Sequence, residues 1–359
     1  MIRTRNFIAI VVAVLAAASL EIAASPPQKD AWEEVAVPTA ASFRGLSALS
    51  DKIVWASGTE GTVIRTIDGG ATWSARAVSG AEKLDFRGIH AFDANSAVIM
   101  SSGNAEEGQA RIYRTTDGGQ TWKLAYEQKT RGVFFDAIAF WDRRHGIVVS
   151  DPVDGRFALF ATADGGATWS QIPAANVPPA LPNEGAFAAS NSCLAVEGES
   201  NVWFVTGGAS VARVFHSHDR GKSWKVAETP LHPANASTGL FSVAFRDAHN
   251  GIAVGGDYAH PTDSQGPVIF LTSDGGASWI AGPATDPPGL FLSSVAYRPP
   301  KSGAGAASII AAGTAGIVSK SPGAGWQKIS AKNVNVVAYS TPETGWAAGP
   351  KGAVLHSHP

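Results

Sequence analysis

A nine-residue motif recurs along the chain and constrains the fold more than any other feature. It reads RTIDGGATW at 65–73, RTTDGGQTW at 114–122, ATADGGATW at 161–169 and LTSDGGASW at 271–279. The tryptophans that end these motifs, together with Trp224 and a more divergent Trp326, lie 47 to 55 residues apart. Repeats of this length are typical of the four-stranded blades of a β-propeller.

Each repeat has the same order of elements. In the fifth repeat these are the apolar stretch LFSVAF, the turn DAHN, a second stretch GIAVGG, a third stretch PVIFLTS, the motif turn DGGAS and a final strand WIAG. The composition, with 39 Gly and 11 Trp but only 16% charged residues, favours many short strands and tight turns. We therefore predict an all-β protein with four-stranded antiparallel blades.

The two ends of the chain are predicted to close the ring. The last repeat, from Asn333, supplies three strands before the sequence ends at Pro359. The stretch AWEEVAVP at 31–38 has the pattern of a fourth strand, with Trp32 at the position that Trp224 holds in its own repeat. Pairing these segments removes two exposed sheet edges. The expected fold is a seven-bladed propeller over residues 32–359.

The acidic residues of the motif are predicted to be structural. Each one opens a tight turn, where its carboxylate can accept hydrogen bonds from backbone N–H groups of the same turn. A catalytic acid is not needed five times in one protein. The five residues are Asp68, Asp117, Asp164, Asp219 and Asp274. In the sixth repeat Ser321 takes this position, and a weaker turn is expected there.

The N-terminal residues predict export. Arg3 and Arg5 precede an apolar run over 7–20 and small residues that end near Ala24, which is the pattern of a secretory signal. We assign 1–24 as a signal peptide and 25–31 as a short linker, and expect a periplasmic or secreted protein. A retained membrane anchor is the alternative, although the apolar run is short for a bilayer span. Cys193 is the single cysteine, so no intrachain disulfide is possible, and it is expected to be buried.

Charge and motifs exclude several classes of function. The formal net charge is -2 and the pI is about 6.5, which does not favour nucleic acid or an anionic membrane as a partner. The chain has no Gly-rich dinucleotide turn, haem-attachment motif or cysteine cluster, so no cofactor is expected. A monomer without a membrane span in the mature chain is expected.

The repeated motifs resemble the Asp-box (BNR) repeats of sialidase-like propellers. Their number and order resemble the photosystem II stability/assembly factor family over about residues 32–359. The stretches FFDAIAFWDRRHGIVVSDPVDGRF and FSVAFRDAHNGIAVGGDY resemble a heterotrophic bacterial branch of that family, which is sometimes labelled oxidoreductase. The resemblance implies binding to another protein, in particular an unassembled reaction-centre subunit.

Loop lengths point to one face of the ring as the functional face. The turns between first and second strands stay short, as in DANS and TPET, whereas the connections NAEEGQ, DPVDGR and DYAHPTDSQG between second and third strands are longer. Propellers usually bind at the central funnel of the face with long loops. The polar candidates for partner contacts there are Arg44, Arg87, Asp136, Asp151, Asp154, Arg156, Glu184, Asp257 and Tyr258.

The sequence also contains two possible metal sites and the basis for one alternative function. The four aspartates Asp136, Asp151, Asp154 and Asp257 offer oxygen ligands for Ca²⁺, but they lack EF-hand-like spacing. The HSH sequence at 216–218, repeated at 356–358, is explained by repeat inheritance better than by a metal pair.

A glycoside hydrolase of the sialidase-like class is the alternative function, since FRGL at 43–46 resembles a sialidase motif. However, FRGI repeats it at 86–89, and no Tyr/Glu nucleophile pair is evident.

Overall fold

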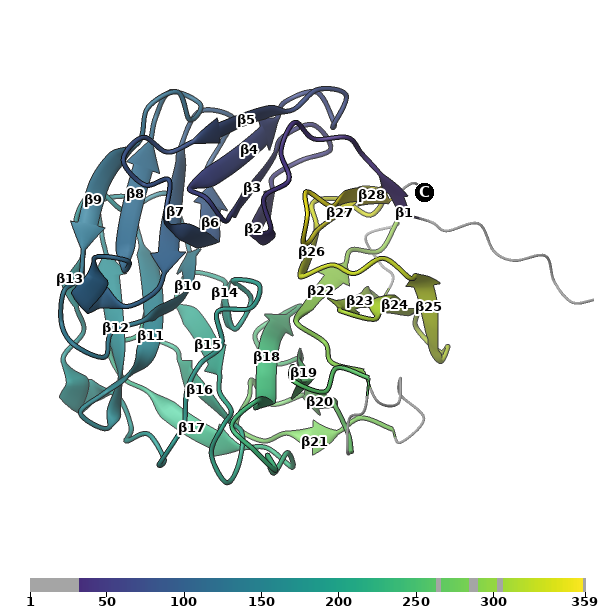
Figure 1. Ribbon diagram of the computed structural model, residues 1–359. Coiled ribbons are helices and arrows are strands. Elements are labelled where there is room, and N and C mark those ends of the chain that lie inside the picture. The colour runs from purple at the N-terminus through teal and green to yellow at the C-terminus, as the bar shows by residue number, and fades with distance from the viewer. Residues whose placement is uncertain (1–31, 263–265, 284–289, 302–305, 358–359) are drawn as a thin grey trace, which may run out of the picture.

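The computed structural model describes residues 32–262, 266–283, 290–301 and 306–357. The predicted signal peptide (1–24) and linker (25–31) lie outside the described residues. Seven four-stranded antiparallel sheets form a ring around a central axis (Figure 1), which confirms the predicted seven-bladed β-propeller. Within the described ranges, no helix has the length and apolar character that crossing a membrane requires.

Every blade runs outward from an innermost strand near the axis. We number the blades in chain order. Blades 1 to 3 consist of β2 (Phe43–Ala48), β3 (Val54–Gly58), β4 (Thr62–Thr66) and β5 (Ser74–Ala77); β6 (Asp85–Ala91), β7 (Ala97–Ser102), β8 (Arg111–Thr115) and β9 (Lys123–Glu127); and β10 (Phe135–Phe140), β11 (Gly146–Val153), β12 (Arg156–Thr162) and β13 (Ser170–Gln171).

Blades 4 to 6 repeat this order. They consist of β14 (Leu194–Glu197), β15 (Asn201–Val205), β16 (Arg213–Ser217) and β17 (Lys225–Glu228); β18 (Thr238–Phe245), β19 (Gly251–Asp257), β20 (Ile269–Thr272) and β21 (Ile280–Ala281); and β22 (Ser294–Arg298), β23 (Ser308–Gly313), β24 (Gly316–Lys320) and β25 (Trp326–Ser330). Two single-turn 3₁₀ helices, η1 (Ala105–Glu107) and η2 (Ala174–Asn176), lie in connections on blades 2 and 3.

Blade 7 joins the two ends of the chain. Its strands are β26 (Val336–Tyr339), β27 (Gly345–Ala348), β28 (Val354–Ser357) and, on the outside, β1 (Trp32–Glu34). Trp32 lies opposite Ser357 and Glu34 opposite Leu355 in an antiparallel register, and Figure 1 shows β1 beside β28. The predicted closure by both termini is confirmed. In this arrangement β1 covers the outer edge of β28, which would otherwise be exposed.

The hydrophobic core lies between adjacent sheets. Its largest members are fully buried aromatic side chains, and Trp203 of β15 stacks on Phe245 of the next blade with ring centroids 3.6 Å apart. The motif tryptophans also pack here: the indole of Trp169 is 8% exposed and its Nε1 donates to the Gly166 carbonyl at 3.2 Å. Packing of this kind fixes each blade against its neighbours.

The Asp-box turns connect the third and fourth strands at one end of the ring. In the first turn, Asp68 Oδ1 accepts hydrogen bonds from the Thr66 hydroxyl (2.7 Å) and the Thr72 N–H (2.9 Å), and Oδ2 accepts one from the Thr72 hydroxyl (2.6 Å). These bonds, that of the Thr72 hydroxyl foremost, lower the pKa of Asp68 to about 2. Gly70 follows with a φ of 87°, which glycine adopts without strain. Each of these polar groups is used within the turn.

Candidate functional site

A pocket of about 500 Å³ lies at the axis, at the end of the ring opposite the Asp-box turns. We call it the funnel pocket. Five of the predicted contact residues line it: Arg44, Arg87, Asp136, Asp151 and Tyr258. The remaining lining residues are Phe134, Ala186, Phe187, Ala188, Ala189, Phe241, Phe291, Ser293, Thr314 and Asn335. Taken together, the lining residues come from six of the seven blades and from the connection before blade 4, so the pocket belongs to the ring as a whole.

β-Bulges direct four side chains into the funnel pocket. The pairing of the innermost strand with the second strand shifts between Phe43 and Gly45 in blade 1, and at the matching position in blades 2, 3 and 5. The extra residues at these shifts are Arg44, Arg87, Asp136 and Phe241. A bulge residue is unpaired in the ladder, and its side chain is re-aimed. One repeated backbone irregularity therefore presents four different side chains to the axis.

A segment of the chain, residues 185–190, runs across the funnel before it enters blade 4. We call it the funnel segment. The Gly185 N–H donates to the Gly207 carbonyl (3.1 Å), and Gly207 also bridges to Gly239 of blade 5. A Cβ atom on Gly207 would lie 2.4 Å from the Gly239 Cα, so only glycine permits this approach. On its far side, the Ser190 hydroxyl donates to the Ser293 carbonyl of blade 6 at 2.6 Å.

The two arginines hold the funnel segment from blades 1 and 2. Arg44 donates through Nη1 to the Ala189 carbonyl (3.0 Å), and Arg87 donates through Nη1 to the Ala188 carbonyl (3.4 Å). Arg87 Nε also pairs with Asp85 at 2.7 Å. Burial, followed by repulsion from Arg87, lowers the pKa of Arg44. Two guanidinium groups on one wall form an attractive position for a carboxylate, because Arg can bind it in a bidentate manner.

Two carboxyl groups of blade 3, those of Asp136 and Asp151, also line the funnel pocket. Burial, together with the charge of Asp151, raises the pKa of Asp136 well above its usual range, and Arg87 partly opposes this shift. Burial raises the pKa of Asp151 to about 6, although the Ala186 N–H, which donates to Asp151 Oδ1 at 3.1 Å, opposes the shift. The pocket is therefore divided into a basic and an acidic side.

Aromatic rings form a third wall. Phe187 of the funnel segment stacks on Phe241 with ring centroids 4.0 Å apart, and Phe291 meets Phe241 edge to face at 4.8 Å. Tyr258 packs edge-on against Phe187 and Phe241 at 6.2 and 6.0 Å, and is itself 54% exposed. The rings give the pocket an apolar surface beside its charges.

The other predicted contact residues lie away from the pocket lining. Glu184 is buried and forms an ion pair with Arg213, whose Nε lies 2.9 Å from Glu184 Oε1. Asp257 accepts hydrogen bonds from Ser237 (2.5 Å) and Asn235 (3.0 Å), which fix its loop. Arg156 donates to a backbone carbonyl of the connection after blade 3. Asp154 is exposed at the tip of the β11–β12 hairpin, with a φ of 51°.

The sequence-based candidates did not include the funnel segment or the phenylalanines. For Phe241, the sequence does contain a signal, which is its position within the repeat. It occupies, in LFS, the position that Arg44 and Arg87 hold in FRG and Asp136 holds in FDA. Aligning the four bulges would have predicted that Phe241 faces the axis. No repeat pattern covers the funnel segment, because it belongs to a connection between blades.

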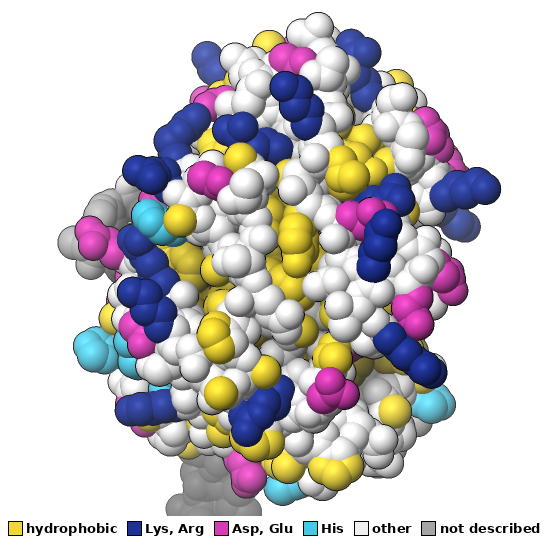
Figure 2. All heavy atoms as spheres, turned by 90° about the vertical axis from the view of Figure 1, so that its left-hand side faces the viewer, with side chains coloured by type: hydrophobic (Ala, Val, Ile, Leu, Met, Phe, Trp, Pro, Cys, Tyr) yellow, Lys and Arg dark blue, Asp and Glu magenta, His cyan; other side chains and the backbone are white. Residues whose placement is uncertain are grey.

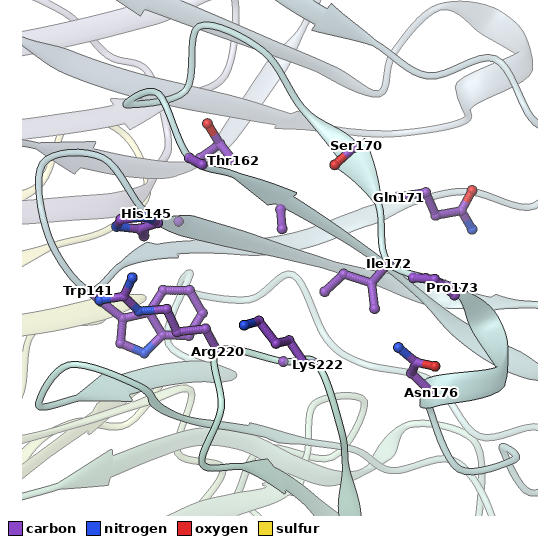
Figure 3. Close-up of a pocket in the computed structure, with 14 residues that line it drawn as sticks. Trp141, His145, Thr162, Ser170, Gln171, Ile172, Pro173, Asn176, Arg220 and Lys222 are labelled. Atoms are coloured by element: carbon purple, nitrogen blue, oxygen red, sulfur yellow. The ribbon is translucent and has the colours of Figure 1, made fainter.

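A second hollow of about 410 Å³ lies between blades 3 and 4, beside an Asp-box turn (Figure 3). Figure 3 shows Trp141 and Arg220 at one end and Gln171 and Asn176 at the other. The Arg220 side chain already donates to the Glu199 carbonyl at 2.6 Å. Equivalent repeat positions line another hollow of about 360 Å³ between blades 5 and 6. A hollow that recurs with the repeat is a consequence of blade packing.

The part of the outer rim at β9 and β13 has no dominant charge (Figure 2). Figure 2 shows the rim at β9 and β13, where basic and acidic side chains are interspersed and hydrophobic side chains lie in the hollows between them.

Within the described ranges, no group of three or more His, Cys, Asp or Glu side chains is arranged to hold a metal ion. His216 is buried, and the His218 ring lies 2.8 Å from the Asn201 amide oxygen. Cys193 is buried.

The fold and the funnel pocket together define a seven-bladed Asp-box propeller with a polar and aromatic axial pocket. Residues 24–129, less than a third of the chain, match the model of a family described as photosynthesis system II assembly factor YCF48. The chain thus resembles a photosystem II assembly factor in its motifs as well as in its fold. No curated protein sequence matches the chain significantly.

Solved structures share the fold at low sequence identity. The structure of YCF48 bound to a D1 peptide has a TM-score of 0.65 and 18% identity, and the match covers 93% of this chain and 96% of that one. YCF48 from Cyanidioschyzon merolae has a TM-score of 0.64 and 17% identity, covering 91% and 99%. The GH74 enzyme of Niastella koreensis is more distant, with a TM-score of 0.52, 13% identity and coverage of 88% and 43%. At these identities the similarity establishes the fold.

Proposed function

We propose that the protein is an exported binding propeller that recognises a segment of another protein in the funnel pocket, in the manner of an assembly factor. The observation that carries the proposal is the pocket itself. Two arginines, two carboxyl groups and five aromatic rings meet at one concave site on a rigid ring. Such a mixture suits oriented contacts with a peptide more than attraction by bulk charge.

Arg44 and Arg87 are the proposed contacts for a carboxylate of the partner. Their guanidinium groups line the pocket, and each makes a bond to a backbone carbonyl of the funnel segment. A guanidinium has five N–H donors, so those bonds leave donors for a partner. The likeness to a YCF48 that binds a D1 peptide supports a peptide-like ligand.

Fluorescence polarisation with labelled peptides tests this proposal. The first probe is a D1 peptide, followed by a peptide library synthesised with free and with amidated C-termini. We expect saturable binding that weakens at least tenfold in the Arg44→Ala/Arg87→Ala variant. It should persist in Arg76→Ala, which removes an exposed arginine of β5. Absence of binding to every peptide, or equal binding by both variants, would overturn the proposal.

The proposed export is a separate element. It rests on the basic start and apolar run of residues 1–20. Cell fractionation with N-terminal sequencing of the mature protein tests it. Recovery of the full-length chain in the cytoplasm would contradict export without affecting the binding proposal.

Glycoside hydrolysis is the competing function for the same pocket. Asp136 and Asp151 both have raised pKa values, and glycosidases use two carboxyl groups, one of them as an acid. A panel of aryl glycosides distinguishes the two functions. Turnover by the wild type that disappears in Asp136→Ala would favour the enzyme over the binding protein.

A further inference from the structure

The acidic side of the funnel pocket contains a carboxyl group that has no partner. Asp136 is 1% exposed, lines the pocket, and its Oδ2 atom accepts no hydrogen bond from any described residue. A buried carboxylate without a partner is costly, because neither water nor the protein solvates its charge. The group must either hold its proton or meet a positive charge from outside the chain.

The arginines of the pocket do not supply that charge by direct contact. Arg87 is near enough to lower the pKa of Asp136, but its guanidinium bonds to Asp85 and to the Ala188 carbonyl. Among the described residues, no ion pair joins Asp136 or Asp151 to a cationic side chain. Asp151 receives one hydrogen bond, from the Ala186 N–H. The acidic side is therefore open to a cation from a ligand.

The aromatic wall lies beside these two carboxyl groups in the same pocket. Phe187, Phe241 and Tyr258 make mutual ring contacts at 4.0 to 6.2 Å. The faces of aromatic rings attract cations, and most strongly where water is excluded. This favours an organic cation, because its charge can face the carboxyl groups while its alkyl chain packs on the rings.

We propose that Asp136, Asp151 and the aromatic wall form a subsite for one organic cation, the ammonium group of a lysine or the guanidinium group of an arginine in the bound protein segment. This inference rests on the proposed function and extends it, because it assigns the second charge of the ligand. A hard metal ion fits less well. Ca²⁺ takes six to eight oxygen ligands, and only two carboxylates line the pocket.

Small amino-acid derivatives test the subsite directly. The probes are Nα-acetyl-lysine methylamide, Nα-acetyl-arginine methylamide and the uncharged Nα-acetyl-norleucine methylamide, titrated by NMR. We expect at least one basic probe to bind about tenfold more tightly than the norleucine probe. The preference should fall to near unity in Asp136→Asn/Asp151→Asn, and severalfold in Tyr258→Leu.

The variants are chosen to remain folded. Asparagine closely matches a protonated aspartic acid in shape, so Asp136→Asn/Asp151→Asn should be at least as stable as the wild type. Tyr258 is more than half exposed, so Tyr258→Leu should leave the thermal midpoint nearly unchanged. Glu106→Gln is the matched control, because it removes an exposed acid from a loop of the same face. Equal binding of the basic and uncharged probes overturns the inference. Displacement of a basic probe by 1 mM CaCl₂ would instead identify a metal site and also overturn it.

The proposed recognition of a protein segment and the proposed cation subsite can be contradicted independently. If peptides bind through Arg44 and Arg87 but show no preference for lysine or arginine, the cation subsite is wrong and the proposed function stands. If the basic probes bind through Asp136 and Asp151 but no peptide binds, the subsite stands and recognition of a protein segment is wrong.

Discussion

The Arg44 guanidinium donates a hydrogen bond to the Ala189 carbonyl, 3.0 Å away and 145 residues further along the chain. Arg87 makes the corresponding bond to Ala188, so arginines of blades 1 and 2 hold the segment that enters blade 4. The proposed partner contacts thus have a structural role as well. Their contributions to folding and to binding must be measured separately.

Arg44→Ala should lower the free energy of unfolding by about 1–3 kcal/mol, because a charge-assisted bond to a carbonyl within the pocket is lost. Urea denaturation monitored by tryptophan fluorescence measures the change. Arg76→Ala, on the exposed outer strand β5, should stay within about 0.5 kcal/mol of the wild type. Equal midpoints for all three proteins would show that the Ala189 bond does not stabilise the fold.

Glu184→Gln should destabilise the protein by about 3–5 kcal/mol. The Glu184 side chain is fully buried and Arg213 is 8% exposed, so the change leaves a buried guanidinium without its counter-charge. The double variant Glu184→Leu/Arg213→Met should recover much of this loss in the same urea experiment. If Glu184→Gln is as stable as the wild type, the ion pair does not stabilise the fold, and Glu184 becomes a candidate partner contact again.

The repeat made most of the fold predictable. The spacing of the motif tryptophans determined the blades, and the position of Trp32 relative to Trp224 determined how the ring closes. Both inferences depend on local patterns that each repeat presents again. An error in one repeat would have been corrected by the others.

The candidate site was less accessible to this reasoning. Long connections pointed to the end of the ring where the funnel pocket lies. However, Glu184 and Arg213 pair with each other, and the sequence contains no pattern that links them. Similarly, the contact of Phe187 with Phe241 depends on how the funnel segment crosses the axis. Contacts between unrelated loops are set by tertiary packing and carry no periodicity.

Removal of residues 32–38 should lower the stability of the whole propeller in one cooperative step, because it exposes the edge of β28. A milder change, Trp32→Ala, removes an indole that is 3% exposed and packs edge-on to Tyr339 at 6.0 Å. We expect a loss of about 3–5 kcal/mol. Differential scanning calorimetry should show one shifted transition. Lys123→Gln, an exposed change on β9, should leave that transition in place.

Thr162→Val should cost about 1–3 kcal/mol without affecting ligand binding. The buried Thr162 hydroxyl accepts the Gly166 N–H at 3.0 Å and donates to Asp164 at 2.8 Å, so valine leaves a buried N–H without its partner. Ser319 occupies the same position in the divergent sixth repeat, where Ser321 replaces the acid. Ser319→Ala should therefore cost much less. Similar losses for both variants would contradict the stabilising role assigned to the complete Asp-box.

Asp151 should make the stability of the propeller decrease as the pH rises from 4 to 7. Burial raises the pKa of Asp151 to about 6 in the folded protein, compared with about 4 in an unfolded chain. The folded state therefore holds the proton more tightly, and the stability that this provides is complete below pH 4 and is lost as the pH rises through 6. Relative to Asp151→Asn, the wild type should lose up to about 2 kcal/mol over this interval.

Urea denaturation at pH 4, 5, 6 and 7 measures this difference, with Glu106→Gln as a control that should parallel the wild type. If Asp151→Asn also parallels the wild type, Asp151 ionises as freely as it does in water, and the acidic side of the funnel pocket is better solvated than its burial implies.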